Sequence, residues 1–195
     1  MRILSVGVLS LQGDVREHVR ATEDSAKRLK KNVTVVPVRT KEDLEGLDGL
    51  IIPGGESTTL FKLCEREGML AGMKKIPNIF GTCAGAIFIA EKVNGKAEAQ
   101  SGLELLDITV ERNAYGTQND SFETNLSTTL GKMHAVFIRA PRITAAGKNV
   151  SVIARNGKDI VACEEKGSDW YYLATAFHPE LTTGLFHDHF LRQMT

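Results

Sequence analysis

The chain has 195 residues, of which 42% are hydrophobic and 25% charged, and its 24 Lys and Arg residues balance its 24 Asp and Glu residues. This composition is typical of a globular protein, and the zero net charge provides no field that would attract nucleic acid or an anionic membrane surface. No stretch approaches the roughly 18 uninterrupted apolar residues that span a bilayer.

The first half of the chain alternates short β-branched runs with amphipathic segments, a pattern that predicts a parallel sheet covered by helices. Strands are expected at residues 3–9, 33–38, 49–52 and 78–81, and helices at residues 14–30, 58–66 and 84–91. Asp14 stands where the N-cap of the first helix belongs. One face of that helix carries the apolar residues Val15, Val19, Ala26 and Leu29.

The second half is richer in strand-forming runs. Strands are expected at residues 105–110, 133–139, 150–154, 159–163 and 170–177, followed by a helix at residues 184–194. Residues 95–102 are expected to form an exposed loop. Because no repeat, low-complexity tract or linker is visible, residues 1–195 are predicted to form a single domain. The predicted fold class is α/β, a three-layer sandwich with a mainly parallel central sheet and helices on both faces.

Three cysteines, Cys64, Cys83 and Cys163, are widely separated and include no C-x-x-C pair. This usage argues against a disulfide framework and a zinc knuckle, and favours a reducing compartment such as the cytoplasm. The apolar run at the N-terminus ends early and no small-residue cleavage site follows it. We therefore interpret it as a buried strand and not as a signal peptide.

Residues 78–87 carry the most informative motif, an apolar strand that runs through G-x-C-x-G into an apolar helix. This is the cysteine version of a nucleophile elbow, a sharp turn at which side chains two residues before and after the nucleophile would collide. Gly81 and Gly85 remove those side chains. The helix N-terminus favours a thiolate at Cys83, and the N–H of Ala84 would donate to an oxyanion. The alternative is a buried cysteine that packs as a small hydrophobic residue.

A cysteine nucleophile needs a base, and the base needs a group that orients its ring. His178 and Glu180 end a predicted strand, and two positions apart they point to the same side if the chain stays extended. Glu180 would then accept a hydrogen bond from the imidazole and leave its other nitrogen facing Cys83. Taken alone, His178 has a structural interpretation, but the combination with Cys83 and Glu180 favours a catalytic one.

Histidine spacing near the C-terminus raises the question of a metal cluster. His187 and His189 lie close to His178 in sequence, but an H-x-H pair on a helix points its two rings to different faces. The sequence therefore predicts no metal site, and it predicts no cofactor.

A second glycine turn lies at residues 50–59, where an apolar strand meets a helix start that Ser57 or Thr58 would cap. The adjacent Gly54 and Gly55 allow backbone N–H groups to approach a ligand closely, so either one is a candidate second oxyanion donor. The alternative is a plain strand-to-helix turn. No Walker lysine follows, so we do not interpret the segment as a phosphate loop.

Together these motifs resemble a known family. GTCAG at residues 81–85 and HPE at residues 178–180 are similar to the triad glutamine amidotransferases. The resemblance narrows to the glutaminase subunits of pyridoxal 5′-phosphate synthase through LQGDVREH at residues 11–18, PGGEST at 53–58, ERNAYG at 111–116, SFE at 121–123, FIRAP at 137–141 and FHPEL at 177–181. It implies the flavodoxin-like fold of class I glutamine amidotransferases, with Cys83, His178 and Glu180 as the catalytic triad.

The resemblance also implies the substrate, its contacts and a partner. The residues that would contact L-glutamine are Gly55, Glu56, Ser57, Arg112, Ile138 (through its backbone) and Arg139. Arginine and glutamate suit this substrate, because its α-carboxylate needs a guanidinium and its α-ammonium needs an anion. Members of the family pass ammonia to a barrel-shaped synthase, which forms a dodecameric core with one glutaminase subunit bound per synthase subunit.

Two other interpretations stay open from the sequence. A cysteine peptidase or glyoxalase-like enzyme would share the elbow, although Glu180 two residues after the histidine and the paired arginines favour glutaminase chemistry. A non-enzymatic binding or scaffold subunit would share the fold, although it would not need the complete set of nucleophile, base and orienting carboxylate.

Overall fold

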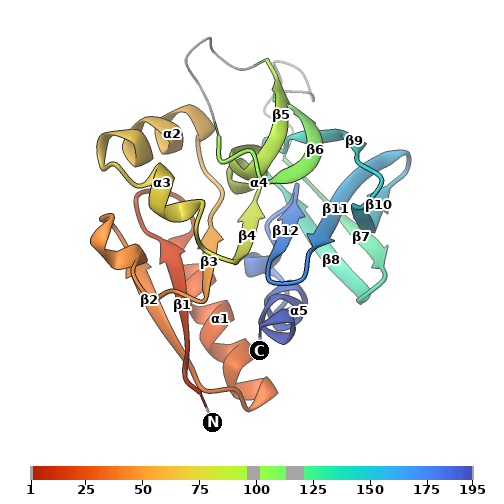
Figure 1. Ribbon diagram of the computed structural model, residues 1–195. Coiled ribbons are helices and arrows are strands. Elements are labelled where there is room, and N and C mark those ends of the chain that lie inside the picture. Colours follow the sequence, from red (N-terminus) through yellow and green to blue (C-terminus); the bar gives the residue numbers. More distant parts are fainter. Residues whose placement is uncertain (1, 96–101, 113–120, 195) are drawn as a thin grey trace.

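The computed structural model describes residues 2–95, 102–112 and 121–194 (Figure 1). The predicted exposed loop at residues 95–102 therefore lies outside the described residues except at its two ends, as do residues 113–116 of the ERNAYG motif. Within the described ranges, none of the helices has both the length and the apolar character that crossing a membrane requires.

Five parallel strands form the half of the sheet that carries most of the helices, in the order β2-β1-β3-β4-β12. These strands are β1 (Leu4–Leu9), β2 (Val33–Val38), β3 (Gly49–Ile52), β4 (Asn78–Thr82) and β12 (Tyr171–Thr175). The helices are α1 (Val15–Leu29), α2 (Ser57–Arg66), α3 (Leu70–Met73), α4 (Ala84–Ile89) and α5 (Leu185–Gln193), with 3₁₀ turns η1 (Glu42–Leu44) and η2 (Pro179–Leu181). The strands and longer helices predicted from the sequence are confirmed here, with ends that move by one or two residues.

An antiparallel extension continues the sheet beyond β12. It consists of β11 (Asp159–Lys166), β10 (Ser151–Asn156), β7 (Phe122–Thr128) and β8 (Gly131–Phe137), and a side branch adds β5 (Ala90–Asn94), β6 (Leu106–Glu111) and β9 (Arg142–Ala146). The sequence did not predict β5, β7 or β9. The helix predicted at residues 84–91 is wrong at its end, because the chain becomes extended at Ala90 (φ −64°, ψ 141°) and pairs with β6.

Helices cover both faces of the parallel half, as predicted (Figure 1). Successive residues of a strand point to opposite faces, and the alternation is visible in β3, where Leu50 and Ile52 join one core and Ile51 the other. The first core receives residues of α2 and α4, including Leu60, Phe61 and Phe88. The second receives residues of α1 and α5, including Ala26, Phe186 and Phe190. The three-layer arrangement therefore follows from buried strands that are apolar on both faces.

The N-caps of two helices differ from expectation. Asp14 occupies the N-cap position of α1, but its side chain makes no capping hydrogen bond. Helix α2 is capped by Glu56, and not by Ser57 or Thr58: the Glu56 carboxylate accepts hydrogen bonds from the backbone N–H groups of Thr58 at 2.8 Å and Thr59 at 2.6 Å. Two orphan N–H groups of the first turn are satisfied in this way.

Candidate active site

Cys83 stands at the strand-to-helix corner between β4 and α4. Its backbone has φ 50° and ψ −104°, a conformation that costs energy for a residue with a side chain. The two flanking glycines make the corner possible. A Cβ on Gly81 would lie 2.5 Å from the Gly85 carbonyl, and a Cβ on Gly85 would lie 2.0 Å from the Ile52 oxygen. The predicted reason for the G-x-C-x-G spacing is confirmed by these close approaches.

His178 and Glu180 follow β12, the strand that pairs with β4. The imidazole Nδ1 lies 2.7 Å from Glu180 Oε1, and both side chains are almost completely buried. The chain does not stay extended between them, contrary to expectation, because η2 begins at Pro179. The two side chains nevertheless meet, so the orienting contact predicted from H-x-E is present by a different backbone path.

Gly54, from the second glycine turn, lies against both the thiol residue and the imidazole. A Cβ at this position would be 2.4 Å from His178 Cε1 and 3.2 Å from Cys83 Cβ. Burial lowers the pKa of His178, but its interactions with Cys83 and Glu180 outweigh that effect and raise the pKa to about 10. An imidazolium beside a thiol is the arrangement that activates a cysteine nucleophile.

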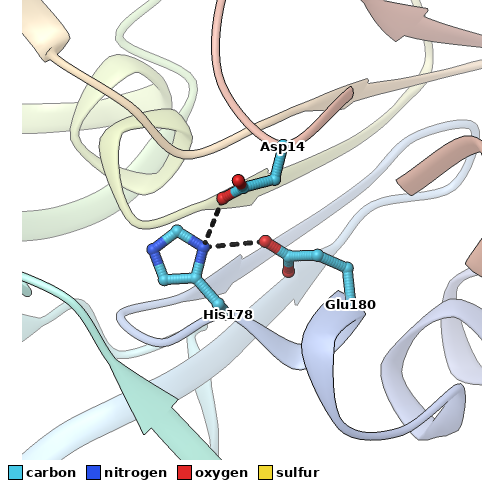
Figure 2. A group of neighbouring side chains, drawn as sticks. All are labelled: Asp14, His178 and Glu180. Atoms are coloured by element: carbon cyan, nitrogen blue, oxygen red, sulfur yellow. Dashed lines mark hydrogen bonds and ion pairs between the residues drawn. The ribbon is translucent and has the colours of Figure 1, made fainter. Parts of the chain in front are cut away.

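Asp14 is a further neighbour of the imidazole that sequence reasoning assigned only to a helix cap. Its Oδ2 lies 3.1 Å from His178 Nδ1, so two carboxylates face the same ring nitrogen (Figure 2). One carboxylate oxygen each of Asp14 and Glu180 and one ring nitrogen of His178 lie within 4.8 Å of one another, close enough to be ligands of one metal ion. The 2.7 Å between His178 Nδ1 and Glu180 Oε1 is that of a direct hydrogen bond.

The glycine loop after β3 is held by a side chain from the loop after β1. Gln12 Nε2 donates to the Glu56 carbonyl at 2.8 Å, and the Glu56 N–H donates to Gln12 Oε1 at 3.3 Å. Gly55 has φ 141°, in the region that favours glycine. Burial raises the pKa of Glu56, but hydrogen bonds from Thr58 and Thr59 outweigh it and lower the pKa to about 2, so the carboxylate is ionised.

Two more residues predicted to contact glutamine lie near these groups: Arg112 at the glycine loop and Ile138 at the thiol of Cys83. Arg112 donates to Thr58 Oγ1 at 3.0 Å and lies 3.5 Å from Glu56 Oε1. Cys83 Sγ donates to the Ile138 carbonyl at 3.7 Å. Arg139 follows directly, is exposed, and has φ 45°. Ser57, the first residue of α2, is buried beside the loop.

The two histidines of the H-x-H pair contact different groups. His187 is buried against His18, with 2.9 Å between His18 Nδ1 and His187 Nε2. His189 lies on another side of α5, where its Nε2 is 2.6 Å from Glu164 Oε2.

Replacing Glu180 with glutamine is expected to remove part of the acid sensitivity of folding. Burial raises the pKa of Glu180, but its interactions with His18 and His178 outweigh burial and hold the pKa well below the ordinary 4.5. Stabilisation by the ionised form is therefore complete above about pH 4.5 and is lost as the pH falls. The measurement is the free energy of unfolding in urea between pH 6 and pH 2.5. As the pH falls, this free energy should decrease in the wild type by up to about 1.4 kcal/mol per pH unit more than in Glu180→Gln.

A Glu-to-Gln replacement at the surface tests whether the effect is specific to Glu180 or follows from the removal of a carboxylate anywhere in the chain. Glu42 has a side chain that is 66% exposed, and Glu42→Gln should leave the pH dependence close to that of the wild type. Parallel stability curves for wild type and Glu180→Gln below pH 4.5 would contradict the prediction.

Comparisons of the sequence and structure with known proteins identify the family of the chain. The model of the SNO glutamine amidotransferase family matches residues 8–195. The chain is 45% identical to the pyridoxal 5′-phosphate synthase subunit PdxT of Korarchaeum cryptofilum over 98% of each chain, and 44% identical to PdxT of Brevibacillus brevis over 96% of each chain. A crystal structure of a glutamine amidotransferase, 44% identical, superposes with a TM-score of 0.80 and covers 96% of this chain and 97% of that chain. The chain belongs to the SNO glutamine amidotransferase family.

Proposed function

We propose that this chain is the glutaminase subunit of a pyridoxal 5′-phosphate synthase and forms one domain over residues 1–195. It hydrolyses L-glutamine to L-glutamate and ammonia, and it supplies the ammonia to a partner synthase. The observation that supports this most directly is the thiol of Cys83 at a strained strand-to-helix corner, beside an imidazole whose far nitrogen is held by Glu180. Relatives with nearly the same length carry the name of that synthase subunit.

The proposed reaction has two steps, both centred on Cys83. The thiolate attacks the side-chain carboxamide carbon of glutamine, and His178 gives a proton to the nitrogen as the C–N bond breaks, which releases ammonia and leaves a thioester. His178 then takes a proton from water, whose oxygen attacks the thioester carbon; the C–S bond breaks and glutamate leaves. Glu180 keeps the imidazole in the tautomer that faces the thiol.

Charge develops on the carboxamide oxygen in both steps. The backbone N–H of Ala84, at the start of α4, is the first proposed donor to this oxyanion. The second is the N–H of Gly54 or Gly55, since the loop that holds them lies against Cys83 and His178. Both proposed donors belong to backbone segments that directly follow parallel strands, β4 and β3, and this supports their assignment.

The proposed glutamine pocket uses the charges around the glycine loop. Arg112 and Arg139 are assigned to the α-carboxylate, and the ionised Glu56 to the α-ammonium. Gly55, Ser57 and the backbone of Ile138 complete the pocket. Support comes from the positions of Arg112 against Glu56 and of the Ile138 carbonyl at the thiol.

The proposed partner is a barrel-shaped synthase in the cytoplasm. Its dodecameric core would bind one glutaminase subunit per synthase subunit, so that ammonia passes between the two proteins. Neither a metal nor a cofactor has a role in the glutaminase reaction proposed here.

The test is a glutaminase assay with the purified chain, alone and with its barrel synthase. Glutamate release from L-glutamine in the presence of the synthase is the expected result. If the assembled complex releases no glutamate, the proposal is wrong. A peptide aldehyde that modifies Cys83 where a glutamine-analogue electrophile fails would point instead to peptidase chemistry.

Replacing Arg112 with glutamine is expected to raise KM for glutamine by at least about tenfold, with kcat within about threefold of wild type. The reason is that a charge-assisted hydrogen bond to the substrate carboxylate contributes roughly 1.5–3 kcal/mol. Initial rates of glutamate release in the complex measure both constants. Arg142→Gln removes a half-exposed arginine that pairs with Asp159 and serves as the control. An unchanged KM in Arg112→Gln would contradict the assignment.

A further inference from the structure

A buried cluster of three polar side chains lies on the far side of Glu180 from the imidazole of His178. Its members, His18 of α1, Thr82 at the end of β4 and His187 of α5, are each 0% exposed. His18 stands at the centre: its Nδ1 is 2.9 Å from His187 Nε2, and its Nε2 is 3.1 Å from Thr82 Oγ1 and 3.4 Å from Glu180 Oε2. We refer to these three residues as the His18 cluster.

Hydrogen-bonding partners decide where the protons of the His18 cluster lie. Burial, with a smaller contribution from His18, lowers the pKa of His187 to about 3, so this ring is neutral and carries one N–H. Within the described part of the chain, His187 Nδ1 has no hydrogen-bonding partner. A proton there would be a buried donor without an acceptor, which is costly. The proton therefore belongs on His187 Nε2, which donates to His18 Nδ1.

This arrangement determines which nitrogen of His18 is the donor. Because His18 Nδ1 accepts from His187, its Nε2 carries the hydrogen and donates it to Thr82 Oγ1 at 3.1 Å, while Glu180 Oε2 lies 3.4 Å from the same nitrogen. Glu180 Oε2 is completely buried and makes no hydrogen bond within the described residues; its contact with His18 Nε2, at 3.4 Å, is electrostatic. A carboxylate oxygen in this position depends on His18 for stabilisation of its charge.

We infer that His18, oriented by His187, is a positioning residue for the reaction proposed above: it fixes the carboxylate of Glu180 so that Oε1 faces His178. The inference rests on the proposed function. It adds His18 to the series Cys83, His178 and Glu180, in which each residue orients the one before it. Asp14, one helical turn before His18 in α1, faces His178 Nδ1 at 3.1 Å. The start of α1 therefore contacts both members of the His178–Glu180 pair.

A purely structural histidine would have different consequences. If His18 only filled space, its replacement would lower stability without changing the reactivity of Cys83. If His18 positions Glu180, its loss weakens the contact with Glu180 that raises the pKa of His178, and Cys83 becomes less reactive. Reactivity of the thiol toward an alkylating agent reports on this directly and does not require glutamine turnover.

The test compares wild type, His18→Leu and His18→Gln in the complex with the synthase. Leucine removes the donor, whereas the glutamine amide can place an N–H near the position of Nε2. We expect His18→Leu to lower kcat for glutamate release by about tenfold with KM within about twofold, and His18→Gln to recover to within about threefold of wild type. Wild-type kcat in His18→Leu would overturn the inference.

Alkylation of Cys83 by iodoacetamide, followed by mass spectrometry of its peptide between pH 5 and pH 9, is the second measurement. The other two thiols are poor targets, since burial raises the pKa of Cys64 and of Cys163 to about 12. In His18→Leu the alkylation profile should move to higher pH by about one unit. An unchanged profile with a lower melting temperature would show a structural histidine and overturn the inference.

The two measurements keep this inference separate from the proposed function. If the wild-type complex releases no glutamate, the proposed function fails, while the alkylation profiles still decide whether His18 acts on His178. If His18→Leu does not fold, His18→Asn replaces it, because the shorter amide reaches toward His187 and leaves Glu180 Oε2 without its polar neighbour. The expected shift of the alkylation profile is the same, and a wild-type profile in a folded His18→Asn overturns the inference.

Discussion

Replacing Cys83 with alanine is expected to lower glutamine-dependent glutamate release in the assembled complex by at least about 10⁴-fold, because no other group can form the thioester. Alanine keeps the backbone N–H and adds no atoms, so the corner between β4 and α4 should be retained. The measurement is initial-rate glutamate formation at saturating glutamine. Pyridoxal 5′-phosphate formation from added ammonium salt should be unchanged, because the synthase then receives ammonia directly.

The chain offers matched controls for this substitution in its other two cysteines. Cys64 and Cys163 are buried, and burial raises the pKa of each thiol to about 12, so neither is available as a thiolate. Cys64→Ala and Cys163→Ala should keep glutamate release within about threefold of wild type where they fold. Substantial turnover by Cys83→Ala, or its loss in a folded control variant, would contradict the assignment of the nucleophile.

The parts of the site that the sequence predicted are those that depend on local geometry. The spacing of Gly81, Cys83 and Gly85 reflects contacts within one turn, and the structure has the close approaches that this spacing predicted. The relation between Cys83 and His178 is not local. It could be predicted because β4 and β12 are parallel neighbours, so the residues that follow them meet at one edge of the sheet.

The parts that the sequence missed depend on contacts between distant segments. Asp14 occupies the N-cap position of the first helix and His18 lies on it, and no spacing in the sequence connects Asp14 with His178 or His18 with Glu180; these contacts form only when α1 packs beside η2. Glu56 was expected in the pocket, but its role as the cap of α2 depends on the exact start of a helix, which sequence patterns place poorly. Strand β7 was missed because most of its residues are polar and at least partly exposed.

Replacing Gly54 with alanine is expected to lower kcat by at least about 100-fold while the protein stays folded. The new Cβ would lie 2.4 Å from His178 Cε1, closer than two carbon atoms can approach, so the imidazole must move away from its place beside Cys83. A displacement of about 1 Å in a reacting group costs roughly 100-fold in rate. Alanine keeps the backbone N–H of residue 54, so the proposed oxyanion donor is retained. The measurement is kcat for glutamate release in the complex, together with the melting temperature.

Gly72→Ala is the matched control for Gly54→Ala. Gly72 belongs to α3, and the nearest atom to a Cβ there would be Leu44 Cδ1, at 2.9 Å, the end of a side chain that can rotate away. Alanine also suits a helix better than glycine, so stability should change little and kcat should stay within about twofold of wild type. If Gly54→Ala keeps wild-type kcat, then the imidazole either tolerates the displacement or is not the base. The contact between the glycine loop and His178 would in that case have no part in catalysis.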